Sequence, residues 1–262
     1  AGVSDVWMPA VTGLCFLPLY LVSVWLLNQV PEPSVADMAS RTARPRMNAA
    51  DRAKFIGQFW IGLVLLFTVY FFLTAYRDFR DNFAVEIWKE IGDKNASSVL
   101  TATELPVGFC VMLVMAALVF VRNNRKAMLV FYWLMFIGVA TIGVSTMLFE
   151  LGFIGPFVWF MLIGLGLYLA YVPVGCMLFD RMIAALGFVG TAGFMIYVAD
   201  AFGYLGSVAI LLLKDFGSPN LSWLNFFTYL SYVVSIVATL GLGIVILYFS
   251  RKTHQNTQEE IV

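Results

Sequence analysis

Long uncharged apolar runs dominate the chain, and short polar joints separate them. Each run comes close to the roughly 20 residues that a helix needs to cross a bilayer. The runs far exceed the roughly ten-residue alternating segments of a membrane β-barrel. The pattern therefore predicts an all-α, polytopic membrane helix bundle of about seven transmembrane helices. The predicted spans are residues 6–30, 56–76 or beyond, 105–121, 127–149, 154–179, 188–213 and 222–249.

One polar joint is much longer than the others. Residues 31–55 hold three of the nine prolines and five basic residues, a composition that favours an extended, solvated linker. The later joints are short, which forces neighbouring helices to run antiparallel. The expected organisation is a transmembrane helix in residues 1–30, a cytoplasmic linker at 31–55, a six-helix transmembrane bundle at 56–250 and a cytoplasmic tail at 251–262.

Composition supports a protein that is surrounded by membrane lipid. The chain is 61% hydrophobic and only 12% charged, whereas soluble domains carry about 25% charged residues. Its formal net charge is zero, so no nucleic-acid partner is expected. The one histidine, His254, lies in the tail, and the sequence has no metal-ligand, cofactor or nucleophile motif. We therefore expect no enzyme and no cofactor. Cys15, Cys110 and Cys176 fall in apolar spans and are interpreted as buried, unpaired thiols.

Basic residues divide unequally between the two sides of the predicted bundle. If the seven spans alternate in direction, eleven of the 16 Lys and Arg residues fall on one side and five on the other. Cytoplasmic joints carry the excess of Lys and Arg in membrane proteins. The N-terminus of this chain is therefore expected outside, and the C-terminus in the cytoplasm.

A run of charges follows the second apolar span, in the stretch "LTAYRDFRDNFAVEIW" at residues 73–88. On a continued helix, Tyr70, Thr74, Arg77 and Asp81 share one stripe, and Arg77 and Asp81 are one turn apart, so we expect them to pair. Charges at bilayer depth are costly unless they are paired and face water, where they mark a pathway. Alternatively, residues 77–90 form an amphipathic helix on the outer face, because residues 55–76 already suffice to cross. The run alone does not decide between the two.

The sixth predicted span carries a carboxylate near its middle. Asp200 is the thirteenth of 26 residues in this span, where an ionised carboxylate is costly and usually functional. Tyr197 lies one turn earlier and is a weaker candidate for lining a cavity. Gly203, Gly206 and Ser207 are small residues that let helices approach closely.

Polar residues also lie near the ends of other predicted spans. Pro173 interrupts the fifth span, and a proline there often kinks a helix that lines a cavity. Asp180 and Arg181 close the same span and are interpreted as a structural latch between helices. Glu104 and Glu150 lie at span ends and are expected to be solvated.

The chain resembles one half of a transporter of the major facilitator superfamily. The stretch "GTAGFMIYVADAFGYLGS" is similar to the eleventh helix of the organophosphate:phosphate antiporter branch, and "YRDFRDNFAVEIWKE" is similar to the seventh. The stretches "RDFRDNFAVEIW" and "YVPVGCMLFDR" also resemble an uncharacterised bacterial family of facilitator-like membrane proteins. The resemblance implies that 6–30 is helix six and that the later spans are helices seven to twelve. It also implies a bacterial inner-membrane location and a missing N-terminal half as a partner.

The resemblance further implies secondary active transport of a small, anionic solute by alternating access. An arginine of the branch's seventh helix contacts the substrate phosphate, and Arg77 takes its place here, with Lys89 and Glu90 matching a later pair. Asp200 stands where that branch is uncharged, which leaves room for proton coupling or for pairing with a buried cation such as Arg80. The candidate solute-binding residues are Arg77, Asp81, Arg80, Asp78, Tyr70 and Thr74, and Asp200 and Tyr197 are candidates for coupling or helix pairing.

Two other classes of membrane protein fit the same seven-span pattern. A seven-span receptor shares the topology, although a retinal pigment needs a lysine in the middle of a helix and Lys214 lies near a predicted end. An accessory membrane subunit without transport is the other alternative. That class predicts that neutral substitutions at Arg77, Asp81 and Asp200 change nothing.

Overall fold

The computed structural model describes residues 3–4, 6–31, 48–92, 96–188, 191–217 and 220–259, and every regular element in them is helical. Seven helices are long and apolar enough to cross a membrane, which confirms the predicted class of fold. The chain divides into two units, one carrying α1 and the other carrying α3 to α9. The elements are α1 (Met8–Asn28), α3 (Ala49–Ile91), α4 (Ala96–Leu118), α5 (Asn124–Glu150), α6 (Pro156–Pro173), η1 (Val174–Leu178), α7 (Phe179–Ala185), α8 (Ala192–Leu212), η2 (Leu213–Gly217) and α9 (Trp223–Glu259).

The first unit is a single apolar helix. Helix α1 has no buried residue, and its apolar side chains lie all around it, as expected for a helix surrounded by lipid. Most of the predicted linker, residues 32–47, lies outside the described residues. Residues 49–55 were predicted to belong to the linker, but they are helical, because α3 begins at Ala49.

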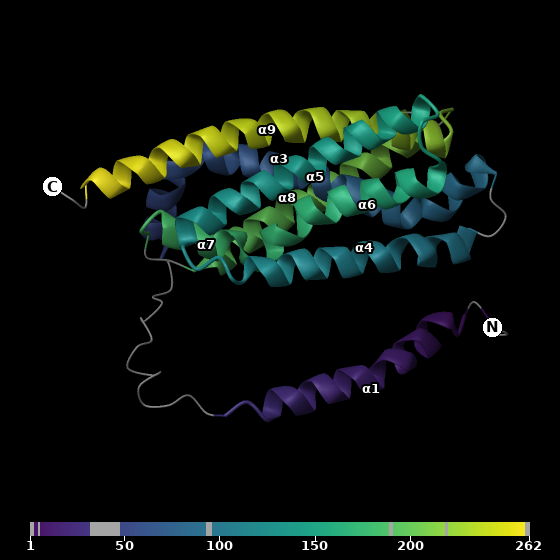
Figure 1. Ribbon diagram of the computed structural model, residues 1–262, viewed down its shortest axis with the longest axis horizontal. Coiled ribbons are helices and arrows are strands. Elements are labelled where there is room, and N and C mark those ends of the chain that lie inside the picture. The colour runs from purple at the N-terminus through teal and green to yellow at the C-terminus, as the bar shows by residue number, and fades with distance from the viewer. Residues whose placement is uncertain are drawn as a thin grey trace. The chain divides into compact units, whose positions relative to one another are not determined.

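The second unit is a bundle centred on α3. Helix α3 packs against α8 and α9 and also touches α6 and α4, while α5 packs against α6 and α9 (Figure 1). The helices alternate in direction, so the basic joints gather at one end of the bundle, at the left in Figure 1, which we call the basic end. It carries Lys54, Arg125, Arg181 and Arg251, and the opposite end carries Glu90, Glu150 and Trp223.

Helix α3 continues through the charged run, with a kink at Phe83. Asn48 and Asp51 form a reciprocal capping box at its start, and Gly92, with a φ of 99°, ends it. The backbone departs from helical angles only at Phe83 (φ −115°, ψ 16°). Ile87 and Trp88 are buried in the bundle core. Residues 77–90 therefore extend the spanning helix, and the surface-helix alternative is wrong.

Small residues bring α8 close to α3, as predicted. A methyl group added to Gly203 would lie 2.7 Å from Thr74 Oγ1, and one added to Gly206 would lie 2.5 Å from the carbonyl oxygen of Phe71. Neither position has room for a Cβ atom. This close contact brings Ser207 of α8 within hydrogen-bonding reach of α3.

The helix at Pro156–Ala185 has a wide turn in its middle. Pro173 has no N–H to complete the helical ladder, and η1 follows it directly as a π-helical segment. Beyond η1, Arg181 Nη1 donates to Asn124 Oδ1 (2.8 Å) and to the backbone carbonyl oxygen of Arg122 (3.5 Å). Arg181 thus ties α7 to the start of α5, and Asp180 beside it is exposed.

The three cysteines differ from the prediction of buried thiols. Cys15, Cys110 and Cys176 are free and lie exposed on helix surfaces. In a membrane helix the faces toward lipid and toward the core are both apolar, so an apolar span does not reveal which face a thiol occupies.

Candidate functional site

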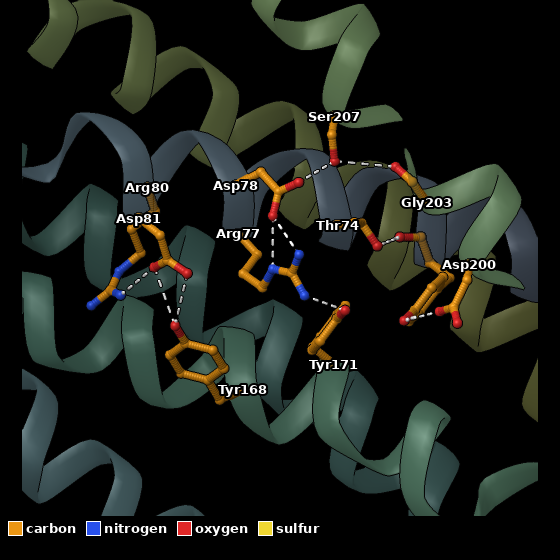
Figure 2. A network of polar contacts seen from close by, with 11 residues as sticks. Thr74, Arg77, Asp78, Arg80, Asp81, Tyr168, Tyr171, Asp200, Gly203 and Ser207 are labelled. Carbon is orange, nitrogen blue, oxygen red and sulfur yellow. Dashed lines mark hydrogen bonds and ion pairs between the residues drawn. The ribbon is translucent and has the colours of Figure 1, made fainter. Parts of the chain in front are cut away.

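The charged run of α3 forms a polar cluster with α6 and α8 (Figure 2). Tyr171 lies about 22 Å along α6 from its start at Pro156, and about 15 Å from Arg181 at the basic end. Ser207 lies about 22 Å along α8 from the basic end. The cluster therefore lies deep within the spans rather than at their ends.

Arg77 points between α6 and α8 and pairs with its neighbour Asp78. Its Nε and Nη2 donate to one oxygen of Asp78, at 2.8 Å and 2.5 Å. Its Nη1 donates to the hydroxyl of Tyr171, and the guanidinium lies 4.6 Å from the centre of that ring. The second oxygen of Asp78 accepts from Ser207 of α8. Arg77 thus bridges α3 to α6, and its pair with Asp78 is fixed from α8.

The predicted pair of Arg77 and Asp81 is wrong. The two residues do share a helix face, but Asp81 turns toward α6, where the Tyr168 hydroxyl lies 3.2 Å from both carboxylate oxygens. Arg80 Nη1 is its other described contact, at 3.4 Å. Asp81 remains 44% exposed, more than any other charged residue of the cluster. Helical spacing permits an i, i+4 pair, but the hydroxyls on neighbouring helices direct each carboxylate elsewhere.

Arg80 is the buried charge of the cluster. Its side chain is only 1% exposed, and Nη2 donates to Glu104 (2.7 Å) and to the carbonyl oxygen of Phe160 (3.2 Å). The guanidinium lies 4.2 Å from the centre of the Phe160 ring, over Gly164, where an added methyl would lie 2.5 Å from Nη2. Among the described residues, Nε of Arg80 has no acceptor. Arg80 therefore joins α3, α4 and α6.

Two predictions about Arg80 and its neighbours need correction. Asp200 is not its partner, because Glu104 takes that place. Glu104 does not lie at a span end, because α4 begins at Ala96 and carries it inside the helix, where its side chain is 37% exposed. Glu150, at the end of α5, accepts from Tyr232 of α9 at 2.6 Å.

Asp200 lies on the other side of Arg77 and meets α3 through a single hydroxyl. Tyr70 donates to it at 3.1 Å, and the Tyr70 ring stacks on that of Tyr171 (5.2 Å between centroids, 9° between planes). Thr74, expected in the solute-binding set, is buried at the contact with Gly203 and donates to the Tyr70 carbonyl oxygen. Tyr70 and Thr74 therefore support the polar residues from within the core.

Tyr197 does not join this cluster. It is 78% exposed and lies beside an open groove at the basic end, which Arg52 and Phe194 also line. The structure thus brings Arg77, Asp78, Arg80, Asp81 and Asp200 together with tyrosines of α6, and leaves Tyr197 and the Arg181 latch outside.

A protein-family model matches residues 1–252. The chain belongs to the DUF5690 family, a family of unknown function. No curated protein and no solved structure matches the chain. The matched part of this DUF5690 member includes every residue of the polar cluster, so the cluster lies within the family's own sequence.

Four residues of the cluster in this DUF5690 member were not predicted to belong to a binding site: Glu104, Tyr168, Tyr171 and Ser207. The two tyrosines are three residues apart in "YLAY", just before Pro173, and therefore lie on one side of α6. That spacing was a usable sign of a polar side of the helix. The sequence predicted a close approach at Gly203, Gly206 and Ser207, but it did not indicate that the Ser207 hydroxyl donates to Asp78.

The cluster's polar groups can be described by the hydrogen bonds that they offer. No group of three or more His, Cys, Asp and Glu residues that could hold a metal occurs in the described part of the chain. The cluster offers guanidinium N–H donors, carboxylate acceptors and tyrosine hydroxyls. These groups suit the binding of a small polar molecule.

Proposed function

We propose that this chain forms one helical bundle of a facilitator-type secondary transporter that moves a small solute with an anionic group by alternating access. The observation that carries the proposal is the place of the paired charges. Arg77, Asp78 and Asp81 lie halfway along the spans and stay partly exposed on the bundle surface. Such a polar face is costly against lipid, so it needs water or a second bundle beside it. Two bundles that rock about a midplane site supply both.

Arg77 is the proposed contact for the anionic group of the solute. A guanidinium has five N–H donors, and three of those on Arg77 are used by Asp78 and Tyr171. Among the described residues, the other two have no acceptor. Its side chain is 25% exposed, so a solute can reach them. The pairing with Asp78 and Tyr171 holds the group in one orientation before the solute arrives.

Asp200 is the proposed coupling group. It lies about 12 Å along α8 from the basic end, and its described hydrogen bond comes from the Tyr70 hydroxyl. A carboxylate at this depth, with no cationic partner among the described residues, usually marks a functional position in a membrane protein. The proposal places the protein in a bacterial inner membrane with its C-terminus in the cytoplasm.

Cysteine accessibility tests the alternating mechanism. Thr68 and Asn82 are exposed on the side of α3 that carries Asp78, about 21 Å apart, and the level of Arg77 along the helix axis lies between them. Each is replaced by cysteine in the full chain after Cys15, Cys110 and Cys176 have been changed to alanine. Ile137→Cys, on an exposed face halfway along α5, is the control. Membrane vesicles of both orientations are treated with a membrane-impermeant thiol reagent, with and without a pH gradient.

The transporter proposal expects opposite changes at the two positions. When the gradient raises the reaction rate of Asn82→Cys, that of Thr68→Cys should fall, and Ile137→Cys should stay unreactive. A receptor or an accessory subunit gives rates that the gradient does not change. If both test positions react as slowly as Ile137→Cys, the polar face lies against lipid or protein and the proposal is wrong.

A further inference from the structure

The charges of the cluster do not balance. Two guanidinium groups face four carboxylates, so with all groups ionised the cluster carries an excess of two negative charges. A simple anion would add to this excess. The cations are Arg77 and Arg80, and the carboxylates are those of Asp78, Asp81, Glu104 and Asp200.

Asp81 is the carboxylate with unused capacity on the open side of the cluster. A carboxylate offers about four acceptor positions, and the Tyr168 hydroxyl has one proton to give although it lies near both oxygens. The contact with Arg80 at 3.4 Å is long, because the Arg80 guanidinium is directed toward Glu104 at 2.7 Å. Asp81 can therefore accept further hydrogen bonds from a group that approaches the exposed face.

Arg77 has the complementary capacity one turn away. It keeps two N–H donors with no acceptor among the described residues, and it lies about 6 Å from Asp81 along the helix axis. Arg77 is 25% exposed and Asp81 is 44% exposed, so these donors and acceptors can be reached from outside the bundle.

From these open positions we infer that the solute is zwitterionic: its anionic group binds Arg77, and its cationic nitrogen group binds Asp81. This inference rests on the proposed transport function and narrows its substrate class. A zwitterion adds no net charge to a cluster that already has an excess of carboxylates. It also supplies an acceptor for Arg77 and a donor for Asp81 in one molecule, which neither a plain anion nor a plain cation does.

Thermal unfolding of the full chain in detergent tests this inference with defined probes. The zwitterions are glycine, β-alanine and 4-aminobutyrate, which differ in the spacing of their charges. Butyrate and butylammonium are the singly charged controls, matched in chain length to 4-aminobutyrate and used at equal ionic strength. A ligand that binds only the folded state raises the unfolding midpoint. The same series is run on Arg77→Gln, Asp81→Asn and, as a control outside the cluster, Asp215→Asn, which removes an exposed carboxylate at the opposite end.

At least one zwitterion should raise the midpoint by several degrees and by more than either matched control. Arg77→Gln and Asp81→Asn should each abolish this rise, and Asp215→Asn should keep it. An equal or larger rise with butyrate means a plain anion site, and one with butylammonium means a plain cation site; either result overturns the inference. No rise with any probe overturns it as well.

The transport proposal and the inference of a zwitterionic solute can be refuted independently of each other. The comparison of the five probes on the unchanged chain decides the inference even where a variant does not fold. If the zwitterions fail while Thr68→Cys and Asn82→Cys still respond oppositely to the gradient, transport stands and only the substrate class is wrong.

Discussion

Replacing Arg80 by methionine probes the buried ion pair that joins α3 to α4. The Arg80 side chain is 1% exposed and donates to Glu104 at 2.7 Å, so Glu104 neutralises a guanidinium that is buried away from water. Methionine keeps an unbranched chain of similar length but has no charge. The companion change, Glu104→Gln, keeps an acceptor oxygen and removes only the negative charge. Each single change leaves one charge without its partner, and the double change removes both.

The geometry sets the expected size of these effects. Removing one partner of a buried pair costs about 3–5 kcal/mol. The lower end applies here, because Glu104 is 37% exposed and water reaches it. Arg80→Met also removes the Nε–H that has no described acceptor, and relief of such a buried group offsets about 1–3 kcal/mol. We expect losses of about 2 kcal/mol for Arg80→Met and about 3 kcal/mol for Glu104→Gln. The double variant should be no less stable than Glu104→Gln alone.

Thermal unfolding of the full chain in detergent, followed by tryptophan fluorescence, measures these losses. Each 1 kcal/mol shifts the midpoint by about 2–4 °C in a chain of this size class. Lys89→Met, which removes an exposed cation from the same helix, should shift it very little. If the two single effects add within about 0.5 kcal/mol in the double variant, the residues are uncoupled and the reasoning about a buried pair is refuted.

Four further outcomes are expected. Gly164→Ala should destabilise the bundle by about 1–3 kcal/mol because its methyl group displaces Arg80, whereas Gly108→Ala, which meets open space on α4, should not lower the unfolding midpoint. Arg77→Ala should lower the midpoint, and adding Asp78→Asn should recover part of the loss while adding Asp81→Asn should not; recovery by Asp81→Asn instead would contradict the described pairing. Asp200→Asn should remove the response of Thr68→Cys to a pH gradient and, because asparagine keeps an acceptor for Tyr70, change stability by no more than about 1 kcal/mol; an unchanged response would leave Asp200 as a packing residue. A reporter that is active only in the cytoplasm, fused after Val262, should be active, and silence would reverse the predicted topology.

The spans of this protein could be read from its sequence because their main determinant is local. A bilayer requires long apolar segments, and the seven runs provide them. The faces of those helices could not be read in the same way. In a soluble protein, polar residues mark the outer face, but lipid accepts the same residues as the core does. Cys110 and Cys176 illustrate this limit, since both lie in apolar runs and on the surface.

The sequence revealed the charged residues of the cluster but not their partners, for a related reason. The charges of the "RDFRD" run stand out locally, so Arg77, Arg80 and Asp81 were identified as candidates. Their partners come from distant segments, and the length of a guanidinium side chain allows several of them. Arg80 reaches Glu104 because a helix begins earlier than its apolar run suggests. Periodicity carries no information on such choices between partners.

The wide turn after Pro173 is the place where we expect the helix formed by α6 and α7 to bend. A proline next to a π-helical segment is the place in a helix where bending is easiest. Tyr168 and Tyr171 lie on one side of it, and Arg181, fastened to Asn124, lies on the other. A displacement of the two tyrosines is therefore expected to bend Val174–Leu178 before it disturbs the hydrogen bond between Arg181 and Asn124. We therefore expect the joint at residues 122–126 to keep its position when the middle of α6 moves.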